Sequence, residues 1–464
     1  MKKGLTYSDV LIVPKKTPLT SRRQANLQTK FSKNVSLNKP FVSSNMATVT
    51  EHEMAIEMAK NGGIGVIHQF QSVESQANQI RNVKRATSYV VEKPVTVEKH
   101  ISLAQAKSIM HENNITSIII TENKTPIGIL TRRDYIFVED ESILVKDLMS
   151  KNLITANKDL SLEEAKKIFA KNKVEKIILL HEENLAGLVT AKDLLNVQRW
   201  KKALRDEKGS LRVAAAVGVK DSLKRSKLLV EAGVDVIVVD IAHAHSDYFI
   251  NTIKELKKEF DVDIVGGNIA TKEAAQELID AGIDGLKVGI GPSPVCSTRL
   301  KSGAGVPQLT ALFDVCSVAN PAGVPVIADG GIKMSGDIVK AIAAGASSIM
   351  SGSLFAGTDE APTPILEKDG RKYKRYMGSA SYKNNENMKM QKSGKRVKQN
   401  LDVFVEGVSK LVDYKGPVKD VVDSLSKGVM SGVSYCGCKN LSDISENVEF
   451  IEITNNSWAE SQTR

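Results

Sequence analysis

The C-terminal half of the chain alternates short apolar runs with longer segments in which apolar residues recur at helical spacing. The runs are rich in valine and isoleucine and recur at roughly 20–25 residue intervals, as strands do in a repeated βα architecture. They occupy residues 234–240, 262–269, 283–291, 324–331 and 346–353. The helical segments occupy residues 222–233, 248–260, 271–282 and 335–345. Because the runs are apolar at successive positions, both faces of each strand are expected to be buried, as in a parallel sheet.

The same rhythm starts near the N-terminus, where residues 40–50, 52–63 and 64–70 read as strand, helix and strand. Most strand ends along the chain are followed by Gly, Asp, Asn or Ser. We therefore predict an α/β fold, a TIM (β/α)8 barrel. In such a barrel the C-terminal ends of the strands carry the functional groups, so these residues should surround one pocket.

An internal repeat interrupts this alternation of strand and helix patterns between about residues 91 and 197. Residues 101–134 can be laid over residues 160–193 at a constant offset, so that Asp134 matches Asp193. A constant offset over roughly 35 residues indicates a duplication. Each copy reads strand–helix–strand–strand–helix and resembles a CBS motif.

A pair of CBS motifs forms one small module, a tandem-CBS or Bateman module, that commonly binds adenine or guanine nucleotides. The resemblance implies that two Thr-x-x-Asp motifs, Thr131/Asp134 and Thr190/Asp193, contact the ribose. The alternative is a module that only mediates assembly. The expected organisation is barrel, inserted module and barrel, at residues 1–90, 91–198 (repeats about 91–140 and 145–198) and 199–464.

Composition agrees with a globular protein, since 42% of the 464 residues are hydrophobic and 25% are charged. No apolar run reaches the roughly 18–20 residues that span a bilayer, and the N-terminus lacks a signal-peptide core, so we expect a cytoplasmic protein. The formal charge of +10 suits anionic ligands. The lysines are spread along the chain without an RNA-binding motif, so neither nucleic acid nor membrane is expected as a partner.

Four cysteines are present, which is too few for a disulfide framework in a chain of this length. Cys436 and Cys438 form a C-x-C pair without a second pair or a nearby histidine, so we expect no zinc site there. Cys316 lies in a helical pattern. Cys296 differs from these three because it lies in a loop rich in glycine and proline.

This loop, GIGPSPVCSTR at residues 289–299, follows directly on an apolar run. Glycines let the backbone approach a ligand closely, and backbone N–H groups in such a loop can bind phosphate. Oriented amides and nearby cations favour the thiolate, so Cys296 is a candidate nucleophile for covalent catalysis. From its spacing alone it can also be an inert small residue.

Two further strand ends suit a nucleotide. Residues 328–331, ADGG, offer a carboxylate for a ribose diol and glycines for a phosphate. Residues 351–353, SGS, form a second phosphate-type turn. Several such turns on adjacent strand ends predict a nucleoside monophosphate lying across the mouth of the barrel.

Along essentially its whole length the chain resembles the IMP dehydrogenase/GMP reductase family, which inserts a CBS pair at the same place. The matching stretches are LTYSDVLIVP, PFVSSNMATVTE, GGIGVIH, VGGNIAT, LKVGIGPSPVCSTR, GAGVPQLTAL, VPVIADGGIKMSGDIVKAIAAGAS, GSLFAGTDEAP, GRKYKRYMGS, VEGVSKLVDYKGPV and SGVSYCGCKNL. The resemblance implies a nicotinamide-dependent oxidoreductase that acts on purine nucleoside 5′-monophosphates.

The resemblance also implies roles for individual residues. Cys296 would add to C2 of the purine, Thr298 would help to activate water or leaving ammonia, and Lys392 and Glu406 would complete the catalytic set. The implied substrate-binding residues are Ser44, Ser293, Asp329, Gly330, Gly331, Gly352, Ser353, Tyr376 and Gly378. The implied cofactor-binding residues are Met46, Asp240, Asn268, Gly289 and Gly291. Carbonyl groups of Gly289, Gly291 and Cys296 would hold a monovalent cation such as K⁺.

Three positions depart from the family pattern. Pro294 stands where the family has serine, which removes a hydroxyl and an N–H from the phosphate side of the loop. Ala47 replaces the usual aspartate. In the flap expected at about residues 380–410, Lys392 and Ser393 occupy the positions of the Arg-Tyr pair that activates water in the dehydrogenases. A lysine is a poor base at neutral pH, so hydrolysis should be slow unless its pKa falls.

The expected reaction is IMP + NAD + water to XMP + NADH through a covalent thioimidate on Cys296. The first alternative is GMP reductase, which converts GMP and NADPH to IMP, ammonia and NADP through the same type of intermediate, as the flap pattern favours. The second alternative is a catalytically weak member that senses nucleotides. A homotetramer or octamer is implied by the resemblance.

Overall fold

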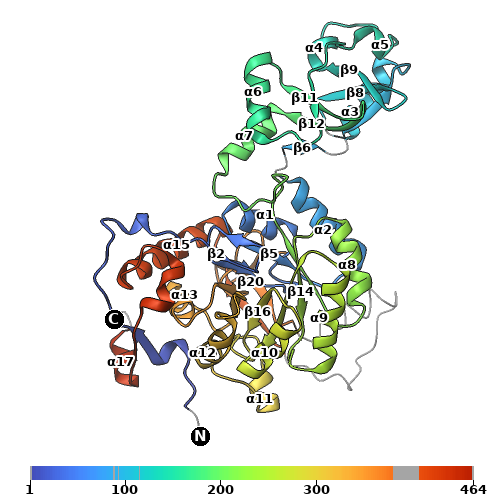
Figure 1. Ribbon diagram of the computed structural model, residues 1–464. Helices are drawn as coiled ribbons and strands as arrows, with labels where there is room; N and C mark the ends of the chain where they lie inside the picture. Colours follow the sequence, from blue (N-terminus) through green and yellow to red (C-terminus); the bar gives the residue numbers. More distant parts are fainter. Residues whose placement is uncertain (1–2, 87–88, 92–93, 114, 380–406, 462–464) are drawn as a thin grey trace. The chain divides into compact units, whose positions relative to one another are not determined.

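The computed structural model describes residues 3–86, 89–91, 94–113, 115–379 and 407–461. The chain divides into two compact units (Figure 1). The first comprises Met1–Ala86, Lys202–Asp206 and Leu211–Arg464, and the second comprises Thr87–Lys201 and Glu207–Ser210. Among the described residues, no helix combines the length and the apolar character needed to cross a membrane.

A closed barrel of eight strands forms the centre of the first unit. The strands follow one another around the barrel in the order β13, β14, β15, β16, β17, β18, β4 and β5, and neighbours are parallel. Their bounds are β4 Phe41–Ser43, β5 Ile64–Ile67, β13 Ala214–Val217, β14 Val236–Asp240, β15 Asp263–Ile269, β16 Gly285–Val288, β17 Val326–Asp329 and β18 Ser348–Ser351. The eight-stranded barrel predicted from the alternating runs is confirmed.

Helices follow the strands and surround the barrel (Figure 1). Their bounds are α1 His52–Lys60, α2 Val73–Arg85, α8 Ser222–Glu231, α9 Asp247–Glu259, α10 Lys272–Asp280, α11 Thr298–Ser302, α12 Gln308–Ala319, α13 Ser335–Ala343 and α15 Val418–Tyr435. In α9, Phe249, Ile253 and Leu256 recur at helical spacing and are fully buried. The helix starts after Ser246, whose hydroxyl accepts a hydrogen bond from the Phe249 N–H at 3.4 Å.

Strands outside the barrel join segments that are distant in the sequence. Strand β1 (Val10–Ile12) pairs antiparallel with β22 (Phe450–Glu452). Strands β19 (Leu366–Lys368), β20 (Arg371–Met377) and β21 (Ser409–Asp413) form an antiparallel sheet beside the barrel mouth. The remaining short elements of this unit are η1 Tyr7–Asp9, η2 Arg22–Gln24, β2 Thr29–Lys30, β3 Ser36–Leu37, η3 Leu441–Asp443, α16 Ile444–Asn447 and α17 Asn455–Glu460.

The second unit contains two sheets with the same internal order. The first sheet consists of β7 Thr96–Glu98, β8 Ser117–Glu122 and β9 Thr125–Thr131. The second consists of β10 Thr155–Asn157, β11 Lys176–His181 and β12 Asn184–Thr190, with β6 Val90–Val91 at its edge. The helices are α3 Leu103–Glu112, α4 Arg132–Tyr135, α5 Val145–Leu148, α6 Leu162–Asn172 and α7 Ala191–Arg199.

The two halves of the second unit agree in backbone detail. The hairpin turns at Asn123–Lys124 and Glu182–Glu183 both have positive φ at two successive residues, and each hairpin has a register shift at the corresponding position. Ile119 and Ile178, which occupy matching positions, pack in one shared apolar cluster. Each half therefore repeats the other's fold, and the apolar contact between them is buried.

Candidate active site

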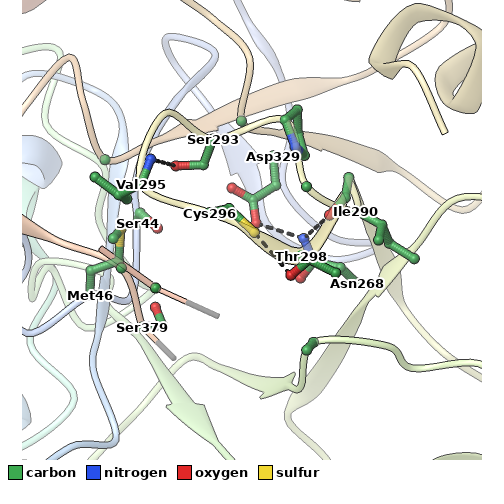
Figure 2. Close-up of a pocket in the computed structure, with 18 of the residues that line it drawn as sticks. Ser44, Met46, Asn268, Ile290, Ser293, Val295, Cys296, Thr298, Asp329 and Ser379 are labelled. Atoms are coloured by element: carbon green, nitrogen blue, oxygen red, sulfur yellow. Dashed lines mark hydrogen bonds between the residues drawn. The ribbon is translucent and has the colours of Figure 1, made fainter. Parts of the chain in front are cut away.

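The C-terminal ends of the barrel strands surround a cavity of about 190 Å³. Loops after β4, β14, β16, β17 and β18, together with β20, contribute its lining. Figure 2 shows ten of the lining residues labelled. The structure brings together sixteen of the residues that the sequence predicted for this site, namely Ser44, Met46, Asp240, Asn268, Gly289, Gly291, Ser293, Cys296, Thr298, Asp329, Gly330, Gly331, Gly352, Ser353, Tyr376 and Gly378.

Other predicted residues lie elsewhere. Lys392, Ser393 and Glu406 lie outside the described residues. Thr131, Asp134, Thr190 and Asp193 belong to the second unit, where each threonine hydroxyl donates to its aspartate, at 2.7 Å and 2.5 Å respectively. These four residues close the N-terminal turns of α4 and α7.

Cys296 lies in the loop between β16 and α11 and is partly exposed to the cavity. Its sulfur lies 3.2 Å from the Thr298 hydroxyl, a contact marked in Figure 2. The loop is held directly before the cysteine side chain, because the Cys296 N–H donates to the Ser293 carbonyl and the Val408 N–H donates to the Val295 carbonyl. A thiol that is open to the cavity and paired with a hydroxyl can act as a nucleophile next to a group that holds a proton.

The side chain of Arg299 also stabilises this loop through hydrogen bonds to backbone carbonyl groups. Its Nε donates to the Ile290 carbonyl at 2.9 Å and one terminal nitrogen donates to the Val306 carbonyl at 2.5 Å. Gly291 has a φ of +79°, and a Cβ there would lie 2.5 Å from the arginine side chain, so glycine is required on both grounds. Burial lowers the pKa of Arg299, and the negative charge of Cys296 as a thiolate opposes that shift. The guanidinium is therefore a nearby fixed positive charge for the nucleophile.

A network of charged groups forms the floor of the cavity. Lys287, in β16, is almost fully buried, and its ammonium group lies 2.7 Å from a carboxylate oxygen of Asp240 and 3.0 Å from one of Asp329. It also donates to the side-chain oxygen of Asn268. The Asn268 amide in turn donates to Asp329 at 2.9 Å and to the Gly289 carbonyl at 2.7 Å. Four strand ends, of β14, β15, β16 and β17, are thus tied together below the cavity.

The charge of Lys287 depends on its two carboxylates. Burial alone would lower the pKa of this ammonium group, but Asp240 and Asp329 outweigh burial, so the pKa is raised and the group stays protonated. Two carboxylates and one ammonium group leave the floor with a net negative charge. Such a floor can accept hydrogen bonds from ribose hydroxyls above it.

The opposite side of the cavity is built from glycines and one tyrosine. Gly330 and Gly331 have φ values of +90° and +79°, which only glycine adopts readily. A Cβ on Gly352 would lie 2.5 Å from the Tyr376 hydroxyl, so this residue also has to be glycine. The Tyr376 hydroxyl lies 3.4 Å from that of Ser293, and burial raises its pKa to about 12. Open backbone and neutral hydroxyls on adjacent turns suit a phosphate group.

A family profile described as IMP dehydrogenase / GMP reductase domain matches residues 4–464. The chain belongs to this family. The family predicted from the sequence, and with it an oxidoreductase of this family, is confirmed.

Relatives named inosine-5′-monophosphate dehydrogenase and relatives named GMP reductase have similar sequence identity to the chain. It is 44% identical to an inosine-5′-monophosphate dehydrogenase of Nitrosopumilus maritimus, over 99% of this chain and 98% of the relative. It is 42% identical to a GMP reductase of Leishmania donovani, over 98% and 95% of the two chains. Among solved structures, a GMP reductase variant of Trypanosoma brucei in complex with guanosine 5′-monophosphate matches with a TM-score of 0.90, at 42% identity, over 100% and 98% of the two chains.

Of the three departures from the family pattern, the structure places Pro294 in the lining of this cavity, whereas Ala47 is not part of the lining and Lys392 and Ser393 lie outside the described residues. A proline at position 294 offers neither an N–H nor a hydroxyl to a ligand. Ser293 remains available beside Tyr376. Of the three carbonyls proposed for a monovalent cation, that of Gly289 already accepts a hydrogen bond from Asn268, so one of its two lone pairs is in use.

Two of the residues that sequence reasoning missed connect the strand ends of the site. Lys287 is the first, and a lysine inside an otherwise apolar buried strand was the available signal. Gln308 is the second. It is buried at the start of α12, and its amide donates to the carbonyls of Val288 and Asp329 at 2.8 Å and 3.3 Å, joining the ends of β16 and β17. The available signal was the stretch GAGVPQLTAL, which contains Gln308 and matches the family.

Proposed function

We propose that the protein oxidises IMP to XMP with NAD and water, through a covalent intermediate on Cys296. The observation that carries this proposal is the pairing of Cys296 with Thr298 at 3.2 Å, in one cavity with the carboxylate of Asp329 and the glycine turns. Relatives named inosine-5′-monophosphate dehydrogenase, such as those of Aquifex aeolicus and Nitrosopumilus maritimus, support this direction at 43% and 44% identity.

In this mechanism the Cys296 thiolate adds to C2 of the purine, so that a carbon–sulfur bond forms while the carbon–nitrogen π bond at C2 opens and its electron pair moves to nitrogen. The hydrogen on C2 then leaves as hydride as this π bond forms again, which leaves a thioimidate on the enzyme. NAD, when bound, supplies the hydride acceptor. Water attacks C2 in the second step, the carbon–sulfur bond breaks, XMP is released, and the thiolate is regenerated with loss of a proton from the water.

The residues of the chain position the nucleotide and hold the proton. Asp329, oriented by Lys287 and Asn268, accepts hydrogen bonds from the ribose hydroxyls. Gly330, Gly331, Gly352, Ser353 and Tyr376 surround the phosphate. In the absence of an arginine base, Thr298 acts together with Glu406: its hydroxyl accepts the proton of the attacking water and passes its own proton to the carboxylate of Glu406. Lys392 is the other candidate base. Met46 and Asp240 lie on the side of the cavity where the nicotinamide would bind. The carbonyl groups of Gly289, Gly291 and Cys296 in the nucleophile loop would hold a K⁺ ion.

GMP reductase is the second candidate, and a structural observation favours it. The solved structures similar to this chain include GMP reductases of Trypanosoma brucei, one with guanosine 5′-triphosphate at a TM-score of 0.80 and 39% identity. Lys392 and Ser393 in place of the Arg-Tyr pair point the same way. In that reaction GMP loses ammonia to form the thioimidate, and hydride returns to C2.

We also propose that the second unit is a tandem-CBS module that binds adenine or guanine nucleotides. Its duplicated sheets and the paired Thr131/Asp134 and Thr190/Asp193 support this interpretation. The corresponding organisation is barrel, module and barrel at residues 1–90, 91–198 and 199–464, with the flap at about 380–410. A homotetramer or octamer is the proposed assembly.

Turnover in two mixtures decides between the reactions. One mixture contains IMP and NAD, the other GMP and NADPH, and the absorbance of the reduced nicotinamide is followed in both, with and without K⁺. A rise in the first supports the dehydrogenase, and a fall in the second supports the reductase. No change in either, with nucleotide still bound, favours the nucleotide-sensing alternative.

The covalent step is tested with Cys296→Ala. We expect turnover in the active mixture to fall at least about a thousandfold, while the affinity for nucleotide changes little. Near-normal turnover of this variant would contradict the covalent mechanism.

A further inference from the structure

Lys374, in the middle of β20, is a buried charge that the proposed mechanism does not use. Its side chain is 3% exposed. All three N–H donors of its ammonium group are taken by carbonyl oxygens of one turn, those of Thr358 at 2.7 Å, Asp359 at 3.0 Å and Ala361 at 2.7 Å. A buried ammonium group is tolerated only where its donors are satisfied. The chain therefore uses this charge to join β20 to the turn at residues 358–361.

Further contacts join the same turn region to the residues after β21. The Lys415 N–H donates to the Gly357 carbonyl at 2.8 Å, and the Asp359 N–H donates to the Gly416 carbonyl at 3.0 Å. The Lys415 ammonium group donates to the carbonyls of Ser353 and Leu354, both at 3.1 Å. Ser353 lies in the phosphate-type turn. The antiparallel strand pair β20–β21 and the segment 353–361 are therefore joined by hydrogen bonds.

The end of the strand pair β20–β21 at Gly378 and Val408 contacts the nucleophile loop. The Gly378 N–H, just after β20, donates to the Val408 carbonyl at 3.1 Å, and the Val408 N–H donates to the Val295 carbonyl at 3.0 Å. Cys296 and Gly407 form a backbone bridge next to this bond. Tyr376, between Lys374 and Gly378, lines the cavity. The strand pair β20–β21 and the residues next to it thus contact both the phosphate-type turn and the loop that carries the nucleophile.

We propose that Lys374 is a positioning residue. It holds the strand pair β20–β21 so that Tyr376 stays beside the phosphate-type turn at residues 351–353 and Val408 stays bonded to the nucleophile loop. The ammonium group of Lys374 holds one end of the strand pair, and the hydrogen bond from the Val408 N–H to the Val295 carbonyl connects the other end to the nucleophile loop. A shift of 1 Å in reacting groups can cost about a hundredfold in rate. The interpretation of these turns as a phosphate site rests on the proposed function, whereas the link to Cys296 does not.

The test compares Lys374→Met with Lys372→Met, which removes an exposed lysine two residues earlier on the same strand. Three quantities are measured at a temperature well below unfolding. These are the rate at which iodoacetamide alkylates Cys296, the affinities for IMP and inosine by calorimetry, and the midpoint of thermal unfolding. Comparing IMP with inosine isolates the contribution of the phosphate.

We expect Lys374→Met to change the alkylation rate of Cys296 by about threefold or more and to reduce the preference for IMP over inosine by about tenfold. Lys372→Met should leave both unchanged. Lys415→Met, which removes two bonds from an exposed lysine without emptying a buried site, should reduce the same preference by a smaller factor. This variant keeps the test decisive if Lys374→Met does not fold.

A Lys374→Met protein with a lower unfolding midpoint, but with wild-type alkylation rate and nucleotide preference, would show a purely structural role and overturn the proposal. So would an unfolded Lys374→Met protein combined with a wild-type preference in Lys415→Met. If the unaltered protein binds neither IMP nor GMP, the proposed function fails. The alkylation comparison still tests the link from Lys374 to Cys296 in that case.

Discussion

Buried charges with partners on several strands determine the geometry of the site at the scale of the residue. Lys287 is the main example, because its ammonium group separates the carboxylates of Asp240 and Asp329. Removal of one partner from a buried ion pair costs about 3–5 kcal/mol, since the remaining charge has no compensation. Here two carboxylates would face each other, and one would have to take up a proton.

We predict that Lys287→Met lowers the free energy of unfolding by about 3 kcal/mol or more and abolishes turnover, because Asp329 loses the group that orients it. Lys254→Met, an exposed lysine on α9, is the control. Denaturant unfolding and calorimetric titration with IMP measure the two effects. Wild-type affinity for IMP in Lys287→Met would show that Asp329 is positioned by other groups.

The four cysteines should differ sharply in reactivity. Burial raises the pKa of both Cys316 and Cys436 to about 12 and also raises that of Cys438. At pH 8 a thiol with a pKa near 12 is a thiolate in only about one molecule in ten thousand. We therefore predict that iodoacetamide modifies Cys296 alone.

Peptide mass spectrometry after partial alkylation of the folded protein makes this check. Labelling of Cys316 or Cys436 should appear only as the pH approaches 12 or when the protein unfolds. Early modification at either position under native conditions would contradict the prediction.

At the scale of the element, the Thr-x-x-Asp motifs of the second unit have a structural role of their own. Thr190 donates to the Asp193 carboxylate at 2.5 Å and accepts from the Asp193 N–H at 3.1 Å, which closes the first turn of α7. The resemblance to CBS motifs assigned these residues to a ribose, whereas the Thr-x-x-Asp spacing is also the pattern of a helix cap. Under the proposed function, a substitution there would change helix stability and nucleotide affinity together.

We predict that Asp193→Ala destabilises the second unit by about 1 kcal/mol, the usual effect of losing a cap, and also weakens binding of ATP or GTP. Ser161→Ala is the matched control, because it removes a similar capping box, with Glu164, at the start of α6 in the same repeat. Thermal unfolding and calorimetry separate the two effects. Equal nucleotide affinity in both variants would mean that Asp193 acts only as a cap.

At the scale of the whole molecule, the barrel is complete without the second unit. Its core is continuous and closes through β4, β5 and β13. Lys84, just before the insertion, pairs with Asp206, just after it, at 3.0 Å. Entry and exit of the inserted segment therefore lie near each other on the first unit.

We predict that replacing residues 87–201 by a short Gly-Ser linker leaves kcat and KM within about threefold of the full chain, because every described residue of the cavity belongs to the first unit. The response of the rate to ATP or GTP should disappear. Steady-state kinetics of both proteins make the comparison. A folded but inactive barrel would show that the second unit contributes to the site.

The sequence by itself determined the barrel, because buried parallel strands and amphipathic helices leave periodic patterns that depend only on neighbouring residues. It also predicted part of the cavity lining, since polar residues at the C-terminal ends of parallel strands must meet at one end of a barrel. Cys296, Asp329 and the glycine turns were found in this way. The duplication was visible for the same local reason.

Only the tertiary structure decided how these groups are held. Lys287, Gln308 and Lys374 act through partners that are 13 to 47 residues away in the sequence, and no local pattern encodes such pairings. Because these side chains are buried, the loss of a hydrogen-bond or charge partner would lower the free energy of unfolding, since an unsatisfied polar group in the interior is costly. The closure of the barrel decides which strand ends are tied together, and the separate sheet of β19, β20 and β21 decides how the nucleophile loop is joined to the glycine turn at residues 351–353.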